Sequence, residues 1–362
     1  MEIHLGLLAI VVLLSLIPDK FINKKKWILP ISFLMILAYW ALRYDYGLDY
    51  WDYLRSFYAG TEGKESRGFG EPGYYIFANL FGSFYQVIIA QSIIVIGTLF
   101  YMVRKYVPSN CYWLFFILFL LVPRFHFVMI SALRNSLAAC VMFWAFDLCY
   151  INKKRWPLYI VFVFLASLFH TTALVFLVFP LVHFFISRAR GMSVFAMLII
   201  ADILSLFVVN FLFNYVISQS ELTETYSNYD ELIGESNLIG VLFKSVILIP
   251  AFYICQSYNK QKLNTSSRNI FVLSFFFLII DLFGFNFGGR FTLYLFLFFI
   301  ISLSLTYQNR KATRLIMLTP YLLYIAFGFY QYYQRLIAGL TNVYSEGNYL
   351  FYHTIFEASP LP

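Results

Sequence analysis

Long apolar runs alternate with short polar segments along almost the whole chain of 362 residues. A helix needs about 20 apolar residues to cross a hydrocarbon core of about 30 Å. Lipid offers open backbone groups no hydrogen-bond partner, so the runs must be helices. The pattern predicts an all-α polytopic membrane protein of about 12 transmembrane helices. The expected spans are 3–18, 27–42, 80–103, 110–123, 132–151, 157–170, 171–187, 192–216, 239–258, 269–285, 290–307 and 315–334.

Several of these segments have unusual lengths. Residues 71–103 would form one helix about 50 Å long, so we expect a re-entrant or interfacial helix near residues 72–82 and a bend near Gly82. Residues 156–186 are too long for one upright span, and the chain is expected to turn near His170. A further break is expected at Pro123. Short or broken helices expose backbone inside the membrane, where membrane proteins build binding sites.

Charge supports this topology and adds an orientation. The composition is 61% hydrophobic and only 12% charged, with mean hydropathy +0.74 and net charge +8. Lys and Arg gather in short loops at every second junction, which the positive-inside rule assigns to the cytoplasm. With these loops inside, both termini are expected to lie outside. The excess of basic residues is then explained by topology, so it does not indicate nucleic-acid binding. We expect a single membrane domain, 1–362, with extracytoplasmic segments 43–79, 217–238 and 335–362, and a tight turn or short loop at each remaining outer junction, including 124–131.

The sequence carries no familiar metal or nucleotide motif. It has no HExxH, no CxxC and no GxxxxGK[ST]. The four cysteines fall within predicted spans, which fits buried thiols and excludes a disulfide framework. We expect no cofactor and no metal, although Asp49 with Glu71 offers two carboxylates to a divalent ion.

Arginines on the outer side of the predicted topology are the first candidates for chemistry. Arg43, Arg134 and Arg290 abut or enter apolar helices in "YWALRYDYG", "MISALRNSLAAC" and "FNFGGRFTLYL". An Arg at the centre of a span costs about 2.5–3.5 kcal/mol or more, so it should face a cavity or a partner. Guanidinium groups bind phosphate in a bidentate manner. We expect these three to hold a lipid diphosphate, with Arg124 as a further candidate; the alternative is pairing with carboxylates or reaching the interface.

The outer loop after the second span combines carboxylates with aromatic side chains. Asp49 and Tyr50 lie in "RYDYGLDYWDY", and Glu71 opens "EPGYY". Aromatic faces and carboxylates together suit sugar binding. His170, in "SLFHTTALVF", falls at the expected turn, and its near-neutral pKa suits a general base. The sequence leaves open whether His170 or Asp49 is that base.

Three acids inside predicted spans, Asp147, Asp202 and Asp281, offer the best argument for a transporter, because such acids serve proton relays. We favour structural hydrogen bonding for them.

The motifs together resemble the EpsG-like branch of the Wzy-type bacterial polysaccharide polymerases. The matching stretches are "RYDYGLDYWDY", "EPGYYIF", "ALRNSLA", "FHTTAL" and "GGRFTLY", in this order between residues 43 and 294. The resemblance implies a glycosyltransferase of the bacterial cytoplasmic (inner) membrane, similar to membrane glycosyltransferases that use polyprenyl donors. Such an enzyme transfers a glycan from undecaprenyl diphosphate to a new lipid-linked repeat unit at the outer face. It implies an undecaprenyl diphosphate-linked oligosaccharide as substrate, and a flippase and a chain-length regulator as partners.

In this interpretation Arg43, Arg134 and Arg290 hold the diphosphate, His170 or Asp49 serves the acceptor, and Glu71 and Tyr50 position sugars. Other functions stay open. A lipid-linked oligosaccharide flippase would explain the span count and the intramembrane acids. An O-antigen ligase would share the chemistry but usually carries a larger late outer loop than 217–238. A non-catalytic scaffold of an export complex would need none of the arginines.

Overall fold

The computed structural model describes residues 2–47, 49–61, 71–211, 245–260, 263–283, 291–309, 313–339 and 353–354. In these residues every regular element is helical except one pair of two-residue strands. The chain divides into two compact units, Met1–Leu177 with Ile325–Pro362, and Val178–Tyr324. The expectation of one membrane domain stays a prediction.

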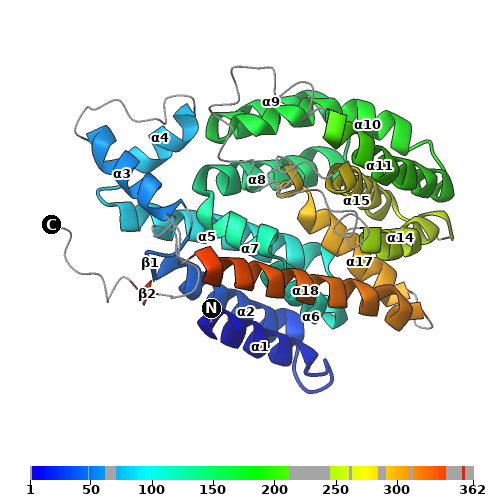
Figure 1. Cartoon of the computed structure of the whole chain (residues 1–362), viewed down its shortest axis with the longest axis horizontal. Helices are drawn as coiled ribbons and strands as arrows, with labels where there is room; N and C mark the ends of the chain where they lie inside the picture. The colour runs from blue at the N-terminus through cyan, green and yellow to red at the C-terminus, as the bar shows by residue number, and fades with distance from the viewer. Residues whose placement is uncertain are drawn as a thin grey trace. The chain divides into compact units, whose positions relative to one another are not determined.

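The first unit begins with α1 (Glu2–Leu16), the π-helix η1 (Lys24–Ile28), α2 (Leu29–Ala41), β1 (Arg43–Tyr44), α3 (Tyr50–Thr61), α4 (Pro72–Asn79) and α5 (Phe84–Tyr106). It continues with η2 (Ser109–Cys111), α6 (Tyr112–Leu121), α7 (Pro123–Ser131), α8 (Leu133–Phe146), η3 (Asp147–Ile151), α9 (Trp156–Phe169) and the 3-10 helix η4 (Thr171–Val178). Helix α5 packs against α2 and α8, α9 packs against α8, and α4 packs against α9 (Figure 1).

The second unit contains α10 (Phe179–Ile186), α11 (Gly191–Phe211), η6 (Ser245–Ile247), α14 (Leu248–Lys260), α15 (Thr265–Phe283) and α17 (Phe296–Asn309). Helix α18 (Arg314–Gly339) contributes residues to both units. Within the second unit α15 packs against α17 and α11, and the Phe277 and Phe299 rings stack 4.8 Å apart.

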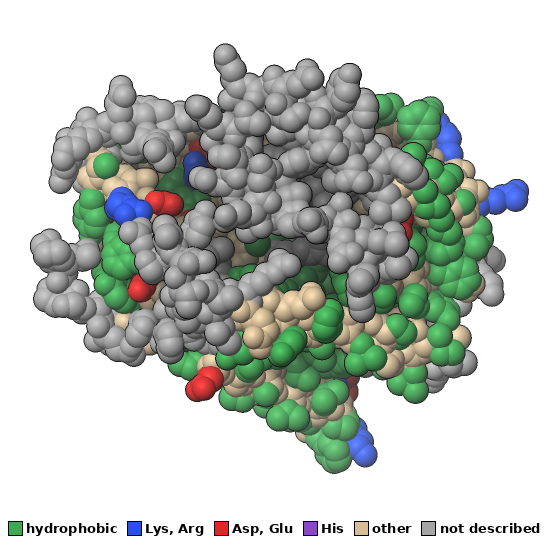
Figure 2. Space-filling view, viewed as in Figure 1, with side chains coloured by type: hydrophobic (Ala, Val, Ile, Leu, Met, Phe, Trp, Pro, Cys, Tyr) green, Lys and Arg blue, Asp and Glu red, His purple; other side chains and the backbone are tan. Residues whose placement is uncertain are grey.

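Three of the described helices are long and apolar enough to cross a membrane: Phe84–Tyr106, Thr265–Leu282 and Arg314–Gln334. The bent pair α6–α7 would make a fourth span, and further apolar helices, such as α1 and α9, are shorter. Many apolar side chains point outward, including Leu13 and Phe185, which are 66% and 60% exposed. Hydrophobic side chains dominate the described surface in Figure 2, where charged ones are scattered. The fold is that of an all-α membrane protein; the count of about 12 spans stays a prediction.

The helix breaks expected from the sequence are present. Helix α4 ends at Asn79 and Ser83 caps α5, so the segment 71–103 is two helices with a break around Gly82. Helix α6 ends at Leu121, and Pro123 starts α7. Whether α4 is re-entrant or interfacial stays a prediction.

One expected outer loop is instead a helix. Residues 124–131 belong to α7, in which Phe125, Phe127, Met129 and Ile130 are almost completely buried. The hydropathy pattern missed this helix because Arg124 and His126 interrupt the apolar run. In the structure His126 is itself buried among aromatic rings, so a polar residue in the sequence does not mark a surface loop here.

Residues 353 and 354 return to the start of the segment 43–79. Strand β2 (His353–Thr354) pairs with β1 in an antiparallel manner, Arg43 opposite Thr354 and Tyr44 opposite His353. The two strands lie side by side at the end of α2 (Figure 1).

Candidate functional site

The candidate site is centred on Glu71, which begins α4. Its carboxylate oxygen Oε1 lies 2.5 Å from His170 Nδ1 and accepts a hydrogen bond from the Thr171 backbone amide at 3.3 Å. The other oxygen, Oε2, forms an ion pair with Arg134 Nη1 at 2.9 Å. Three residues that the sequence singled out separately thus meet at one carboxylate. We call Glu71, His170, Arg134 and their neighbour Tyr53 the Glu71 cluster.

The "EPG" sequence explains how Glu71 reaches this position. Pro72 occupies the first turn of α4, where its missing N–H costs nothing. A Cβ on Gly73 would lie 2.9 Å from both the backbone carbon and the carbonyl oxygen of Leu168 in α9. Only glycine therefore allows α4 to approach the end of α9 this closely. That approach sets Glu71 beside the residue that follows α9, which is His170.

His170 lies where the chain reverses direction. Helix α9 ends at Phe169, and His170 adopts an extended conformation with φ −156° and ψ 121°. The 3-10 helix η4 then runs back along α9, since the Tyr159 hydroxyl donates to the Phe176 carbonyl at 3.0 Å. The turn expected near His170 is confirmed. This turn places the His170 imidazole and the Thr171 backbone amide next to each other after the end of α9, and both face the Glu71 carboxylate.

Arg134 enters the cluster from the first turn of α8. Its Nε donates to the Tyr53 hydroxyl at 3.3 Å, and its guanidinium carbon lies 5.6 Å from the Tyr53 ring centroid. Tyr53 packs on Tyr74 of α4 with ring centroids 5.4 Å apart. The side chain of Arg134 is 34% exposed, whereas that of Glu71 is 8% exposed. The arginine therefore connects a buried carboxylate to the surface, and its Nη2 has no partner among the described residues.

The environment holds Glu71 in its charged form. Burial alone would raise the pKa of Glu71, but the hydrogen bond with His170, the charges of His170 and Arg134, and the Thr171 amide together outweigh burial and lower it. Burial raises the pKa of Tyr53, an effect that Arg134 partly offsets. At neutral pH the cluster thus holds a carboxylate, a guanidinium and a neutral phenol.

The charge of Glu71 also fixes the tautomer of His170. An ionised carboxylate can only accept hydrogen bonds, so Nδ1 must carry the proton that it donates to Glu71. In a neutral imidazole the lone pair then resides on Nε2. The Nε2 atom is buried and has no hydrogen-bond partner within the described part of the chain. This is the arrangement of a base held in one orientation by a carboxylate.

Arg43 is placed differently from the other candidates. It is 1% exposed, and its guanidinium donates to the carbonyl oxygens of Trp40 at 2.6 Å and Ile130 at 3.1 Å. It also reaches Ser92 Oγ at 3.3 Å and Gln91 Oε1 at 3.5 Å. These contacts join the end of α2 to α5 and α7. Diphosphate binding by Arg43 stays a prediction.

The tyrosine-rich loop forms a packed core. Tyr50, Tyr53, Leu54 and Phe57, spaced at three to four residues, form one face of α3 that is buried against α4, α5 and Leu133 of α8. Gly47 supports this packing at φ +122°, where a Cβ would lie 2.9 Å from Ser131 Oγ. The packing of this segment therefore places Tyr53 beside Arg134.

Tyr50 belongs to this core, and Asp49 directly precedes it in the chain. Tyr50 is 4% exposed and lines a narrow cavity of about 10 Å³ that also touches Arg43, Tyr53 and Ser131. Such a cavity holds about one water molecule and no sugar. The carbonyl of Asp49 accepts a hydrogen bond from the Tyr53 amide at 3.1 Å. Sugar binding by Tyr50 and base catalysis by Asp49 stay predictions.

The remaining candidates lie partly or wholly outside the described residues. Arg290 is outside them, and Arg124 is described only as a backbone position in α7. Among the residues that the structure describes, no group of three or more His, Cys, Asp or Glu side chains is placed to hold a metal ion. All four cysteines are buried thiols, and none of them forms a disulfide.

Tyr53 is the member of the cluster that sequence reasoning missed. A signal was present: its three- and four-residue spacing to Tyr50 and Phe57 marks the buried face of a helix. The sequence could not reveal that this face meets α8 at Arg134.

The family model that describes the EpsG family matches residues 26–345. The chain belongs to the EpsG family. The match covers Glu71, Arg134 and His170 and the motifs around them. No curated protein and no solved structure matches this EpsG-family chain.

Proposed function

We propose that this EpsG-family protein is a polysaccharide polymerase of the bacterial inner membrane. It transfers a growing glycan from undecaprenyl diphosphate to a new lipid-linked repeat unit at the outer face. The observation that carries the proposal is the Glu71 cluster, in which a carboxylate orients an imidazole beside a partly exposed guanidinium. Family membership supports polymer synthesis, and the helical, apolar fold supports a membrane location.

The cluster supplies the two functions that this reaction needs. In the transfer, the acceptor hydroxyl oxygen bonds to the anomeric carbon of the donor sugar, and the bond from that carbon to the diphosphate oxygen breaks. The electron pair leaves with undecaprenyl diphosphate. His170 Nε2 takes the hydroxyl proton, and Glu71 stabilises the imidazolium that forms. Arg134 stabilises the charge that develops on the diphosphate.

The proposal assigns the base to His170, because its Nδ1 is already held by Glu71 and its Nε2 has a lone pair. Since Nε2 is buried in this structure, the groups that cover it must move when the acceptor binds. Arg290, which lies outside the described residues, stays a candidate for binding the diphosphate in this proposal. A flippase that delivers repeat units and a chain-length regulator are the proposed partners.

The contacts of the intramembrane acids weaken the case for a transporter. Asp147 accepts from Lys105 Nζ at 2.7 and 2.8 Å and from the Tyr106 hydroxyl. Asp202 accepts from Ser245 Oγ at 2.6 Å. Both acids thus have the structural hydrogen bonds that the sequence favoured for them.

The test is complementation of a deletion strain, with surface glycan resolved by length. Wild type restores long chains, whereas Arg134→Ala and His170→Ala leave single repeat units on the lipid carrier or on the surface. An exposed-residue variant, Asp52→Asn, serves as control at matched membrane levels. Accumulation of single units on the cytoplasmic side in the deletion would indicate a flippase. Long glycan chains that persist in the deletion strain without being attached to their final acceptor would indicate a ligase.

A further inference from the structure

A second polar site lies at the far end of the helices that carry the Glu71 cluster. Helix α5 starts near that cluster at Phe84 and ends at Tyr106, about 34 Å away at 1.5 Å per residue. Helix α8 (Leu133–Phe146) carries Arg134 in its first turn, and Asp147, which directly follows the helix, forms an ion pair with Lys105 of α5. The two sites are therefore at opposite ends of the same two helices, and so at opposite faces of the membrane.

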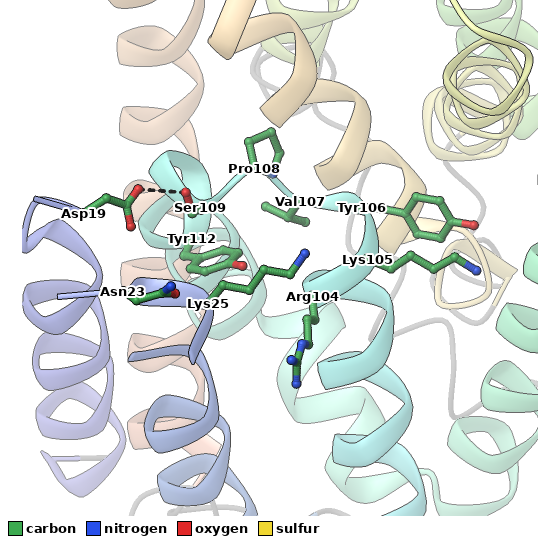
Figure 3. A pocket seen from close by; sticks show the side chains of 10 residues that line it. All are labelled: Asp19, Asn23, Lys25, Arg104, Lys105, Tyr106, Val107, Pro108, Ser109 and Tyr112. Atoms are coloured by element: carbon green, nitrogen blue, oxygen red, sulfur yellow. Dashed lines mark hydrogen bonds between the residues drawn. The ribbon is translucent and has the colours of Figure 1, made fainter. Parts of the chain in front are cut away.

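At this far end the structure contains a pocket of about 490 Å³. The link between α1 and α2 and the first turn of η1 form one wall, and the end of α5 with the start of α6 forms the other (Figure 3). Its polar lining consists of Asp19, Asn23, Lys25, Arg104, Lys105, Tyr106, Ser109 and Tyr112. The pocket thus offers cations, hydroxyls and an amide together, which is the donor set that phosphate oxygens require.

The charge of the pocket is positive. Its one carboxylate, Asp19, already accepts from Ser109 Oγ at 2.8 Å and from the Lys24 amide at 3.4 Å. Lys105 is paired with Asp147 at 2.7 Å. Lys25 and Arg104 have no carboxylate partner among the described residues, and Figure 3 shows the Lys25 side chain beside the Tyr112 ring, with Arg104 at the end of α5. Two cations without a carboxylate partner therefore line one cavity.

The helix dipole does not explain this arrangement fully. Cations in the last turn of a helix complement its C-terminal partial charge, which accounts for Arg104 and Lys105 at the end of α5. Lys25 is the second residue of η1, which continues directly into α2, so it lies at the start of this helical stretch, where a cation gains nothing from a helix dipole. Its place opposite Arg104 thus calls for a negatively charged partner.

The surroundings of the pocket indicate a lipid. Phe21 and Trp27, on either side of Lys25 in the chain, are 72% and 52% exposed. The Lys20 and Lys26 ammonium groups lie over these rings, at 4.7 and 5.3 Å from the centroids. Exposed aromatic rings with adjacent cations are typical of the membrane–water interface. Basic pockets between transmembrane helices on the cytoplasmic side bind anionic lipid headgroups.

We propose that Lys25 and Arg104, with the Tyr112 hydroxyl, form a binding site for the phosphate of an anionic phospholipid in the leaflet opposite the Glu71 cluster. The basic loops assign this leaflet to the cytoplasm. The site is independent of the proposed transfer reaction, since its ligand stays bound and is not consumed.

The experiment uses the full-length protein, purified in a neutral detergent. Native mass spectrometry counts phosphatidylglycerol and phosphatidylcholine adducts, and a melting curve follows titration with each lipid and with inorganic phosphate. Wild type should bind phosphatidylglycerol at least about tenfold more tightly than phosphatidylcholine, since two charge-assisted contacts distinguish them. Lys25→Ala/Arg104→Ala should lose about tenfold or more of that preference.

The control is Lys153→Ala/Arg190→Ala, which removes two exposed cations from other basic loops and should leave the preference unchanged. Equal loss in both double variants would mean that only the overall charge matters, and would overturn the proposal. If inorganic phosphate raises the melting temperature and phosphatidylglycerol is not preferred over phosphatidylcholine, the ligand is a soluble anion. That result would overturn the lipid assignment. Retention of the preference in Lys25→Ala/Arg104→Ala would place the site elsewhere.

Discussion

The substitution Glu71→Gln tests the core of the proposed site, because it keeps the side-chain shape and removes only the charge. In wild type the carboxylate accepts hydrogen bonds from His170 Nδ1 at 2.5 Å and from the Thr171 amide at 3.3 Å. It also forms an ion pair with Arg134 Nη1 at 2.9 Å. Glutamine has one carbonyl oxygen and an NH₂ group. An NH₂ group in place of Oε1 would meet the Thr171 amide, and His170 could accept from it only by changing tautomer. An NH₂ group in place of Oε2 would meet the Arg134 guanidinium, so in either orientation a donor meets a donor.

The structure sets the size of the expected effect on stability. Breaking a buried ion pair costs about 3–5 kcal/mol, but the side chain of Arg134 is 34% exposed and can regain water. A hydrogen bond to a charged group contributes about 1.5–3 kcal/mol. We therefore expect Glu71→Gln to lower the free energy of unfolding by about 2–3 kcal/mol, which a melting curve detects as a shift of several degrees.

The expected effect on activity is larger. Without the carboxylate, His170 loses both its fixed tautomer and the stabilisation of its protonated form. General acid–base catalysis typically contributes about 10²–10⁴-fold to the rate, so Glu71→Gln should lose about that much. The assay is glycan extension in proteoliposomes that contain lipid-linked repeat units, with products separated by length.

Asp52→Asn is the matched control. Asp52 lies in the same outer segment and pairs with Arg55 at 3.0 Å, but both side chains are exposed, at 76% and 60%. Loss of this exposed ion pair should lower the free energy of unfolding by less than about 1 kcal/mol. Glycan extension should be unchanged. Wild-type extension and wild-type melting in Glu71→Gln would refute the reasoning.

A double variant separates structure from catalysis. Glu71→Gln/Arg134→Gln removes both charges of the pair and should recover part of the stability lost in Glu71→Gln, since no charge is left unpaired. Extension should stay low in the double variant, because the base has lost its carboxylate and the diphosphate its guanidinium. Recovery of extension together with stability would mean that the cluster is only structural.

Three further predictions follow from the same geometry. Gly73→Ala should abolish long-chain synthesis in complementation, since its Cβ would lie 2.9 Å from Leu168 backbone, whereas Gly82→Ala, with its nearest atom at 3.8 Å, should be tolerated; equal activity of the two would contradict the packing argument. Arg43→Gln should lower the yield of monodisperse protein on size-exclusion chromatography, because buried carbonyls lose their donor at about 1–3 kcal/mol each; normal yield with lost extension would favour diphosphate binding instead. The lowered pKa of Glu71 predicts that its contribution to stability is complete above its ordinary value of 4.5 and disappears as the pH falls through the lowered pKa. Melting temperatures measured from pH 7 to pH 3 should therefore converge for wild type and Glu71→Gln at the acid end, and parallel curves would refute this.

The sequence predicts the helical membrane fold and the main helix breaks because these depend on local signals. Pro123 removes a backbone donor, and the apolar run on either side of His170 is too long for one span. The motif residues Glu71, Arg134 and His170 stand out because each is polar beside apolar helix. Their selection as candidates therefore needs no knowledge of which helices pack together.

Other features depend on contacts between distant segments and have no local signal. Arg43 is bound by the Ile130 carbonyl, 87 residues further along the chain. A backbone carbonyl gives no sign of its role in the sequence, whereas the fit of a guanidinium group to phosphate is known from the residue type alone. The helix α7 is hidden for a similar reason, since His126 becomes compatible with burial only through the rings that surround it.

The pairing of β1 with β2 affects the order in which the protein is completed during synthesis. Arg43 and Tyr44 leave the ribosome about 310 residues before their partners His353 and Thr354. At about 5–20 residues per second, this interval lasts roughly 15–60 s. During that time the strand edge at the end of α2 is open in a partly inserted chain. A ribosome that stalls or stops before residue 353 therefore leaves a protein in which helix α2 is complete but strand β1 has no partner strand.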